Sequence, residues 1–226
     1  MESRFLRGVL AAAAVCASTA VAANPVVAVS EGFEPGAPLT DWLAINLSVP
    51  AGQDWFQGNA GIFTAQAGSD DSYIAANFLS AANGAGTIEN WVVTPAFASL
   101  GHGTLTFWTR TEMAGFTDRL QVRFNSTGSA NVADFDQVLL DINAAEAVDG
   151  FPTDWTQFAV NYVGVEGNQG RFAIVYRNAD AANFPNYVGV DTVDIVAVPI
   201  PGSLFLVMAG FGAAGLARRT SMKSVA

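Results

Sequence analysis

One cysteine and one histidine stand in a chain of 226 residues, and this scarcity excludes several kinds of chemistry. Cys16 lies near the N-terminus, so the remainder of the chain offers no thiol for a disulfide, a thiolate metal site or a catalytic nucleophile. His102 stands between two glycines, with no second histidine to complete a metal pair and no nucleophile-elbow motif in the chain. We therefore expect no catalytic residues and no enzymatic activity.

Positive charge is also scarce, and the ends of the chain hold half of it. Five of the ten basic residues are terminal, as is one of the 20 acidic residues, so residues 24–198 hold five arginines, no lysine and 19 acidic residues. The formal charge of this part is −14, against −10 for the whole chain. Such a surface repels phosphate backbones, so we expect no nucleic acid partner. Cations are the natural binding partners of such an acidic surface. The alternative is that the acidity serves only to keep the protein soluble.

Amphipathic helical patterns of useful length are missing, and short alternating segments take their place. In residues 119–124, for example, Leu120, Val122 and Phe124 alternate with polar side chains, which is the period of a half-buried strand. About ten such segments, separated by turns rich in glycine, proline, asparagine and aspartate, predict an all-β fold. We expect a jelly-roll β-sandwich of two antiparallel sheets over residues 24–198. Residues 187–198 are apolar enough to form a central strand covered on both faces.

The break between residues 104–111 and 118–124 has the length of a hairpin loop, so these two segments are expected to pair. In a hairpin, Asp118 and its neighbour Arg119 lie across from Arg110, and we expect cross-strand charge pairing on the solvent face, with Asp118 as the carboxylate partner. Trp108 falls on the same polar face, and Phe116 lies at the tip of the loop. Both are candidate ligand-binding residues, as platforms for sugar rings, with a loop covering Trp108 as the alternative. The other four tryptophans border predicted strands and are expected in the core.

Residues 1–23 have the pattern of a signal peptide. Arg4 and Arg7 precede an apolar run that ends in small residues, so we expect cleavage after Ala22 or Ala23. Residues 199–226 contain a second apolar stretch, which is shorter than the about 20 residues of an independent bilayer span. We expect this stretch to form a C-terminal hydrophobic sorting helix that contacts the membrane before processing. A buried strand followed by a turn is the alternative.

Seven short motifs occur in a fixed order, and the order is more specific than any one motif. They are E-G-F-E (31–34), N-W-V-V-T-P (90–95), L-T-F-W-T-R-T (105–111), D-R-L-Q-V-R-F (118–124), W-T-Q-F (155–158), G-R-F-A-I-V-Y (170–176) and Y-V-G-V-D-T-V (187–193). In this order they resemble the choice-of-anchor J domain family, which is similar to the cleaved-adhesin modules of secreted proteases and to MAM-type jelly rolls. The resemblance covers roughly residues 29–198 and implies a bacterial surface domain with no fixed ligand.

The tail resembles a PEP-CTERM sorting signal. Its motif reads Pro199-Ile200-Pro201-Gly202, with isoleucine where the family has glutamate, and the apolar stretch ends at Arg218-Arg219. The resemblance implies processing by an exosortase-type sorting enzyme and an association with exopolysaccharide. It also implies a location at the cell surface or in the extracellular matrix of a Gram-negative bacterium.

Asp191 lies inside an otherwise apolar segment, where an ionised carboxylate is costly unless it is paired or bound to a metal. Many jelly rolls place a structural Ca²⁺ where the first and last strands meet, with carboxylate and carbonyl oxygens as ligands. We therefore expect Glu34 and Asp191 as Ca²⁺ ligands, with Asp70 or Asp71 as further candidates. An Asp191 satisfied by arginine or by backbone amides is the alternative.

Three functions fit these observations. The first is a noncatalytic exported surface or matrix protein that serves as an adhesion or structural module. The second is a Ca²⁺-dependent carbohydrate-binding module for exopolysaccharide, which requires exposed aromatic side chains on a sheet face or on loops. The third is a glycoside hydrolase on the same scaffold, which requires two facing carboxylates in a cleft.

Overall fold

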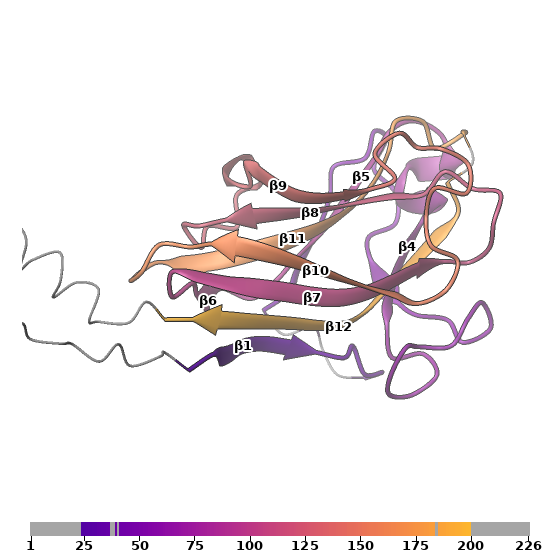
Figure 1. Cartoon of the computed structure of the whole chain (residues 1–226). Helices are drawn as coiled ribbons and strands as arrows, with labels where there is room; N and C mark the ends of the chain where they lie inside the picture. The colour runs from indigo at the N-terminus through magenta and orange to yellow at the C-terminus, as the bar shows by residue number, and fades with distance from the viewer. Residues whose placement is uncertain (1–23, 37–38, 40, 184, 200–226) are drawn as a thin grey trace, which may run out of the picture. The chain divides into compact units, whose positions relative to one another are not determined.

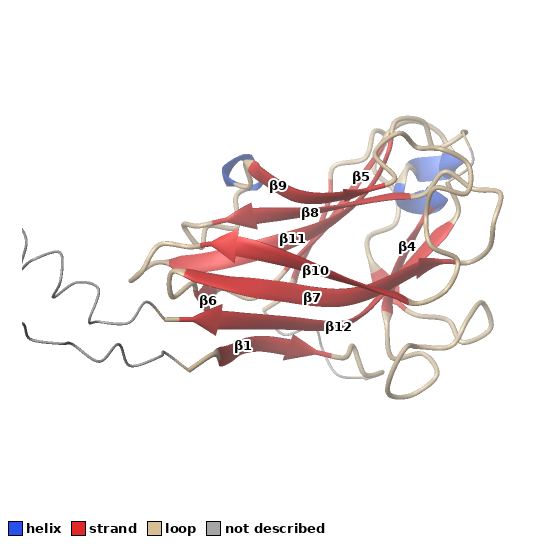
Figure 2. Ribbon diagram, in the orientation of Figure 1, coloured by secondary structure: helices blue, strands red, loops and turns tan. Residues whose placement is uncertain are grey.

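The computed structural model describes residues 24–36, 39, 41–183 and 185–199. The predicted signal peptide and, beyond Pro199, the predicted sorting segment lie outside the described residues. Within the described part, nearly all regular structure is strand, with three short 3-10 helices (Figure 2). The strands are β1 (Val26–Glu31), β2 (Leu43–Asn46), β3 (Phe56–Gln57), β4 (Ile74–Asn77), β5 (Ile88–Val93), β6 (Phe97–Ala98), β7 (His102–Thr111), β8 (Arg119–Asn125), β9 (Gln137–Ile142), β10 (Thr156–Val163), β11 (Gln169–Asn178) and β12 (Tyr187–Val198).

The strands form two antiparallel six-stranded sheets that pack face to face (Figure 1). The first sheet has the order β10-β7-β12-β4-β3, with β1 beside β12. The second has the order β2-β5-β11-β8-β9, with β6 beside β11. The main core lies between the sheets and takes side chains from both, such as Leu105 and Phe107 on β7 and Val122 and Phe124 on β8. The predicted sandwich of two antiparallel sheets is confirmed.

Strand β12 is central in the first sheet, as its apolar sequence predicts. It pairs with β7 along nearly its whole length, and β1 and β4 share its other edge. A bulge between Asp191 and Asp194 interrupts the pairing with β7, and Thr192 adopts a positive φ of 48° there. The bulge reverses the alternation, so Val188 and Val190 before it and Val193 and Ile195 after it all face the core. The expected cover on both faces holds for Tyr187–Asp191, whereas alternate residues after Asp191 are only partly buried.

The predicted hairpin between β7 and β8 is wrong, because the two strands belong to different sheets. β7 pairs with β10 and β12, whereas β8 pairs with β9 and β11. The loop between them crosses from one sheet to the other, a span of about 10 Å that a seven-residue loop covers easily. The expected cross-strand pairing of Arg110 with Asp118 is therefore absent among the described residues. Arg110 instead lies over the ring of Phe63, with 4.5 Å between its guanidinium carbon and the ring centre.

The tryptophans follow the prediction with one exception. Trp42, Trp55 and Trp91 are buried, whereas Trp155 is only partly buried. Trp155 packs on the outer face of the first sheet against Phe63, Tyr73 and Tyr187, and its indole N–H donates to the carbonyl of Thr64. The loop between β3 and β4 thus covers this outer face at one end of the sheet.

A second loop covers part of the outer face of the second sheet. Val132 and Phe135, from the segment between β8 and β9, pack on Trp91, Val93 and Val175. The part of this face nearer the start of β5 remains outside that apolar cluster. Among the described residues, no helix is long and apolar enough to cross a membrane.

Candidate functional site

A row of side chains crosses the outer face of the second sheet at the end where β5 begins. Strand register places Glu89 on β5 opposite Arg177 on β11, and Arg177 opposite Arg119 on β8. Leu47, which directly follows β2 in the chain, extends the row on the other side of Glu89, because its amide donates to the carbonyl of Glu89. Two like charges directly opposite each other destabilise a sheet unless other groups compensate them. The sequence nevertheless places two arginines side by side here.

Three carboxylates compensate these arginines. Arg119 makes a two-pronged contact with Asp141 on β9, at 2.9 Å from Nε and 2.7 Å from Nη2, and its Nη1 lies 3.1 Å from Glu146. Arg177 Nη2 lies 3.3 Å from Glu89. These charged side chains keep only 14% to 31% of their surface exposed, so solvent screens them less than fully exposed pairs.

Hydrogen bonds determine the charge states of Arg119 and Asp141. Hydrogen bonds to Asp141 raise the pKa of Arg119 above its usual value, despite burial, which acts in the opposite direction. Burial pushes the pKa of Asp141 upward, but the hydrogen bonds from Arg119 and Gln121 outweigh it and hold that pKa below its usual value. Both groups are therefore charged across the physiological pH range.

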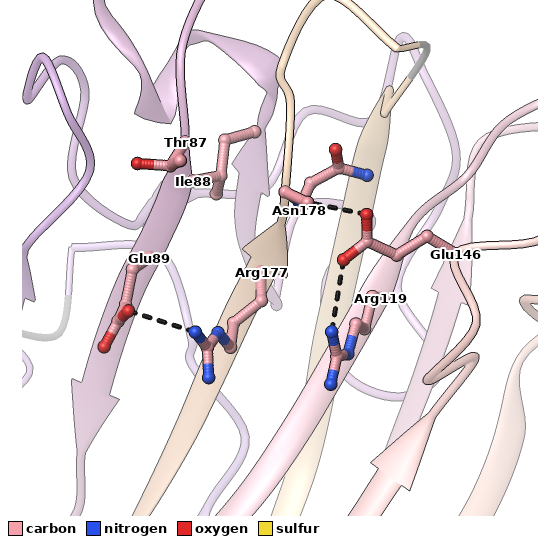
Figure 3. A pocket seen from close by; sticks show the side chains of 8 residues that line it. Thr87, Ile88, Glu89, Arg119, Glu146, Arg177 and Asn178 are labelled. Carbon is pink, nitrogen blue, oxygen red and sulfur yellow. Dashed lines mark hydrogen bonds and ion pairs between the residues drawn. The ribbon is translucent and has the colours of Figure 1, made fainter.

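A pocket of about 200 Å³ lies over this row (Figure 3). Its walls come from the start of β5, the end of β11, the start of β8 and the loop after β9, which contributes Glu146. In Figure 3 the Glu89–Arg177 pair stands on one side and the Arg119–Glu146 pair on the other. The backbone amide of Ala179 donates to the second oxygen of Glu146 at 3.0 Å and holds that loop residue against β11. The lining residues are Thr87, Ile88, Glu89, Arg119, Glu146, Arg177, Asn178 and Ala179.

Arginine is concentrated on this sheet face. In β11 the register aligns Arg171, Ala173, Val175 and Arg177 with one face, and in β8 it aligns Arg119, Gln121 and Arg123 with the same face. Four of the five arginines in residues 24–198 therefore project from one side of an acidic domain. Arg123 lies over the indole of Trp91, 5.4 Å from the ring centre, and Arg171 donates to two backbone carbonyls. Arg119 and Arg177 are left as the two that line the pocket.

The two predicted platform residues lie elsewhere. Trp108 is partly buried in the middle of β7, on the outer face of the first sheet, opposite Gln157 and Asp191. Phe116 is partly buried in the loop between β7 and β8, where its carbonyl accepts the amide of Asp149. The two side chains lie in different parts of the domain, and their role in ligand binding stays a prediction.

The predicted Ca²⁺ ligands Glu34 and Asp191 contact the same loop, between β3 and β4. The carboxylate of Asp191 is fully buried and accepts hydrogen bonds from the backbone amides of Gln66, Ala67 and Thr192. The Thr192 hydroxyl lies 3.3 Å from it and 2.9 Å from the side-chain oxygen of Gln66. Burial raises the pKa of Asp191 even though these bonds act against it. This is the backbone-amide arrangement that the sequence left open as the alternative.

Glu34 is exposed at the surface. The hydroxyls of Ser72 and Ser69 donate to one of its oxygens, and the Ser72 bond is the largest cause that lowers the pKa of Glu34. Asp70 is exposed and Asp71 partly buried in the same turn. In the part of the chain that the structure describes, no three histidine, cysteine or acidic side chains gather as metal ligands. Ca²⁺ binding at Glu34 and Asp191 stays a prediction.

Of the residues assigned to the sorting signal, only Pro199 is described, and it is partly buried directly after β12. Pro201, Gly202, Arg218 and Arg219 lie outside the described residues.

Comparison with known proteins assigns the family. A family model described as Cleaved Adhesin Domain matches residues 26–190. The chain belongs to the cleaved adhesin domain family. The match includes every strand of the second sheet and all residues of the pocket. No curated protein matches this cleaved adhesin domain.

Solved structures of the family share the fold. The K1 cleaved adhesin domain of Lys-gingipain from Porphyromonas gingivalis W83 is 26% identical, with a TM-score of 0.56 over 75% of this chain and 97% of that chain. The K3 domain of the same protein is 22% identical, with a TM-score of 0.54 over 77% and 99%. A Stig cyclase, Fisc from Fischerella sp. TAU, is 14% identical, with a TM-score of 0.50 over 78% and 99%. At that identity the likeness is one of fold alone.

The sequence pointed to one of the four charged residues that line the pocket. The alternation in residues 119–124 places Arg119 on the face away from the core. Arg177 and Glu89 lie just outside the predicted strands, since each is followed by an asparagine and not by an apolar residue. Glu146 carried no such signal, since it lies in a turn after β9 whose course depends on the fold.

Proposed function

We propose that this cleaved adhesin domain is a noncatalytic adhesion module that acts outside the cell. The observation that carries the proposal is the family match over residues 26–190. It supports attachment to another surface or macromolecule as the activity. The polar pocket on the second sheet supports carbohydrate as the class of ligand, because its charged side chains provide many hydrogen-bonding groups.

The proposal includes a route to the cell surface. Export by the signal peptide of residues 1–23 and sorting by an exosortase-type enzyme at residues 199–226 agree with an extracellular adhesion module. The proposed location is the surface or the extracellular matrix of a Gram-negative bacterium, where exopolysaccharide is an available partner. Assignment to the choice-of-anchor J group within this architecture is part of the same proposal.

The chemistry of the pocket supports binding over hydrolysis. Glu89 accepts from Arg177 and from the indole of Trp91, and Glu146 accepts from Arg119 and from the amide of Ala179. Glycoside hydrolysis requires one carboxyl group that gives up a proton to the leaving oxygen. Carboxylates held by guanidinium and N–H donors act as acceptors instead.

A binding screen of the full chain tests the proposal. The labelled chain is applied to a glycan array that includes bacterial exopolysaccharides and to a panel of extracellular-matrix proteins. We expect saturable binding to at least one glycan, with the bound glycan recovered intact by mass spectrometry. Absence of binding to every glycan and every matrix protein contradicts the adhesion function, and release of shortened glycan contradicts a noncatalytic role.

A further inference from the structure

The pocket offers donors and acceptors together. Arg119 has five N–H groups and uses three of them on Asp141 and Glu146, which leaves two. Arg177 uses two, on Gln121 and Glu89, which leaves three. Each oxygen of Glu146 accepts one hydrogen bond and so retains a free lone pair. A hydroxyl group donates and accepts at once, so a ligand with several hydroxyls satisfies both kinds of group.

The charge of the lining argues against a simple ion. Two arginines and two glutamates line the pocket, so its formal charge is zero. An anion that approaches the guanidinium groups is repelled by the two carboxylates, and a cation that approaches the carboxylates is repelled by the two guanidinium groups. A neutral polar ligand avoids both penalties.

The size of the pocket limits the ligand. Its volume of about 200 Å³ lies below the roughly 300–1,000 Å³ of sites that bury drug-sized molecules. The pocket therefore suits one small ring, with the remainder of any larger ligand extending into solvent.

An apolar ledge borders the polar pocket on its β2 side. Val49 lies opposite Thr87 in an isolated bridge, and Leu47 lies beside Glu89 through a backbone hydrogen bond. Cross-strand neighbours point to the same face of a sheet, so these two side chains stand next to the pocket wall. They keep 44% (Leu47) and 66% (Val49) of their surface exposed. A ligand with hydroxyls along one edge and C–H groups on one face matches this combination.

We propose that the pocket binds a single neutral sugar ring. Arg177 and Arg119 donate to adjacent ring hydroxyls, Glu89 and Glu146 accept from them, and the C–H face of the ring packs on Leu47 and Val49. This inference rests on the proposed adhesion function and names its ligand class and its site. It places carbohydrate on the second sheet, away from Trp108 and Phe116.

The location of the pocket suits an adhesion site. Arg119 follows Asp118, whose carboxylate accepts the amide of Asn186 just before β12 begins. The pocket is therefore near the start of β12, and the 12 residues of that strand place its end about 40 Å away. β1 begins beside that far end, as the pairing of Val26 with Ala197 shows (Figure 1). The first and last described residues of the domain therefore lie at one end of the sandwich, and the pocket lies at the other.

Titration of the full chain with simple glycosides tests the inference. The probes are methyl α-mannopyranoside, methyl β-galactopyranoside and methyl β-glucopyranoside, with sodium glucuronate as the anionic comparison. Affinity and location are read together from ¹H–¹⁵N spectra. We expect at least one glycoside to shift the amides of residues 87–89 and 177–179, and glucuronate to bind no more tightly than the matching neutral glycoside.

Variants separate the pocket from the rest of the surface. Arg177→Gln removes the guanidinium fork and is expected to raise Kd at least about tenfold, because it deletes charge-assisted hydrogen bonds. Val49→Ser removes apolar contact at an exposed site and is expected to raise Kd about threefold. Arg110→Gln is the matched control, since it makes the same chemical change on the other sheet and is expected to leave Kd within about twofold. Melting curves confirm that each variant is folded.

Each of the following results overturns the inference. They are shifts confined to residues outside the pocket, unchanged affinity in folded Arg177→Gln, loss of binding in Trp108→Ala with the pocket variants unaffected, and much tighter binding of glucuronate. A chain that adheres to glycans or matrix proteins but shows no pocket shifts with any glycoside also overturns it, while the adhesion function stands. A chain that adheres to nothing defeats the proposed function itself, and the inference with it.

Discussion

Replacement of Asp118 by asparagine tests whether the buried carboxyl group of this residue carries a proton. Asp118 is fully buried between the sheets, and one of its oxygens accepts from the Tyr176 hydroxyl at 2.7 Å and from the Asn186 amide at 2.8 Å. Its other oxygen lies 2.6 Å from the Thr111 hydroxyl, which also lies 3.1 Å from the carbonyl of Tyr187. One hydroxyl proton serves only one of these two acceptors. A protonated Asp118 that donates to Thr111 lets Thr111 donate to the carbonyl of Tyr187, which also accepts the amide of Glu112 at 3.1 Å.

The pKa supports the same assignment. Burial raises the pKa of Asp118, and the nearby Glu112 adds to the rise, while hydrogen bonds from Thr111, Asn186 and Tyr176 act against it. Within the described residues, no arginine or histidine forms an ion pair with Asp118. A folded-state pKa above the unfolded value of about 3.9 means that the native state binds the proton more tightly. The resulting stabilisation is complete below that unfolded pKa and is lost as pH rises through the folded pKa.

The expected magnitudes follow from the hydrogen bonds. Asparagine keeps an acceptor for Tyr176 and Asn186 and supplies an N–H donor to Thr111, so we expect Asp118→Asn to stay within about 1 kcal/mol of the wild type near pH 4. Alanine leaves the Tyr176 hydroxyl and the Asn186 amide without a partner, at about 1–3 kcal/mol each, so Asp118→Ala should cost about 2–6 kcal/mol.

Denaturant unfolding of the full chain between pH 4 and pH 8 measures these differences. As pH rises, the wild type loses the stabilisation tied to its proton and the asparagine variant does not, so we expect Asp118→Asn to gain on the wild type. A wild type that gains on Asp118→Asn with rising pH refutes the reasoning. An asparagine variant as unstable as the alanine variant does so as well.

Three further predictions concern other parts of the domain. Asp141 has a lowered pKa, so its stabilisation is present above the unfolded pKa and lost as pH falls; Asp141→Asn should cost about 1–3 kcal/mol at pH 7 and less at pH 3. An equal cost at both values in urea titrations contradicts this. If Glu34 and Asp191 bind Ca²⁺, EDTA should lower Tm by several degrees, Ca²⁺ should restore it, and Asp191→Asn should abolish the response. A Tm that does not change with EDTA means that Asp191 is held by its hydrogen bonds alone. A chain that ends at Val198 should melt cooperatively at the Tm of the full chain, because β12 ends there; aggregation of the shortened chain assigns the tail to the core.

The local sequence pattern was sufficient to predict where strands occur but not which strands pair. The alternation in residues 119–124 and the apolar run of residues 187–198 each predicted a strand that the structure contains. Alternation shows that a strand has one buried face, but both sheets of a sandwich bury a face in the same core. The pairing of β7 with β8 was therefore indistinguishable, in sequence, from a crossing between sheets.

The same limit applies to the candidate site. Glu89, Arg177 and Arg119 come from three distant parts of the chain and meet only through the pairing of β5 with β11 and of β11 with β8. Asp191 shows the converse. Its unusual position in an apolar strand was visible in the sequence, whereas the amides that satisfy it come from a loop about 125 residues earlier.

The most direct test of the sugar site is a crystal structure of the chain with the glycoside that binds most tightly in the titrations. We expect a sugar ring in the pocket, with hydroxyls within hydrogen-bond distance of Arg177 and Glu146 and its C–H face on Leu47 and Val49. A ring stacked on Trp108, or one bound anywhere outside the second sheet, contradicts it.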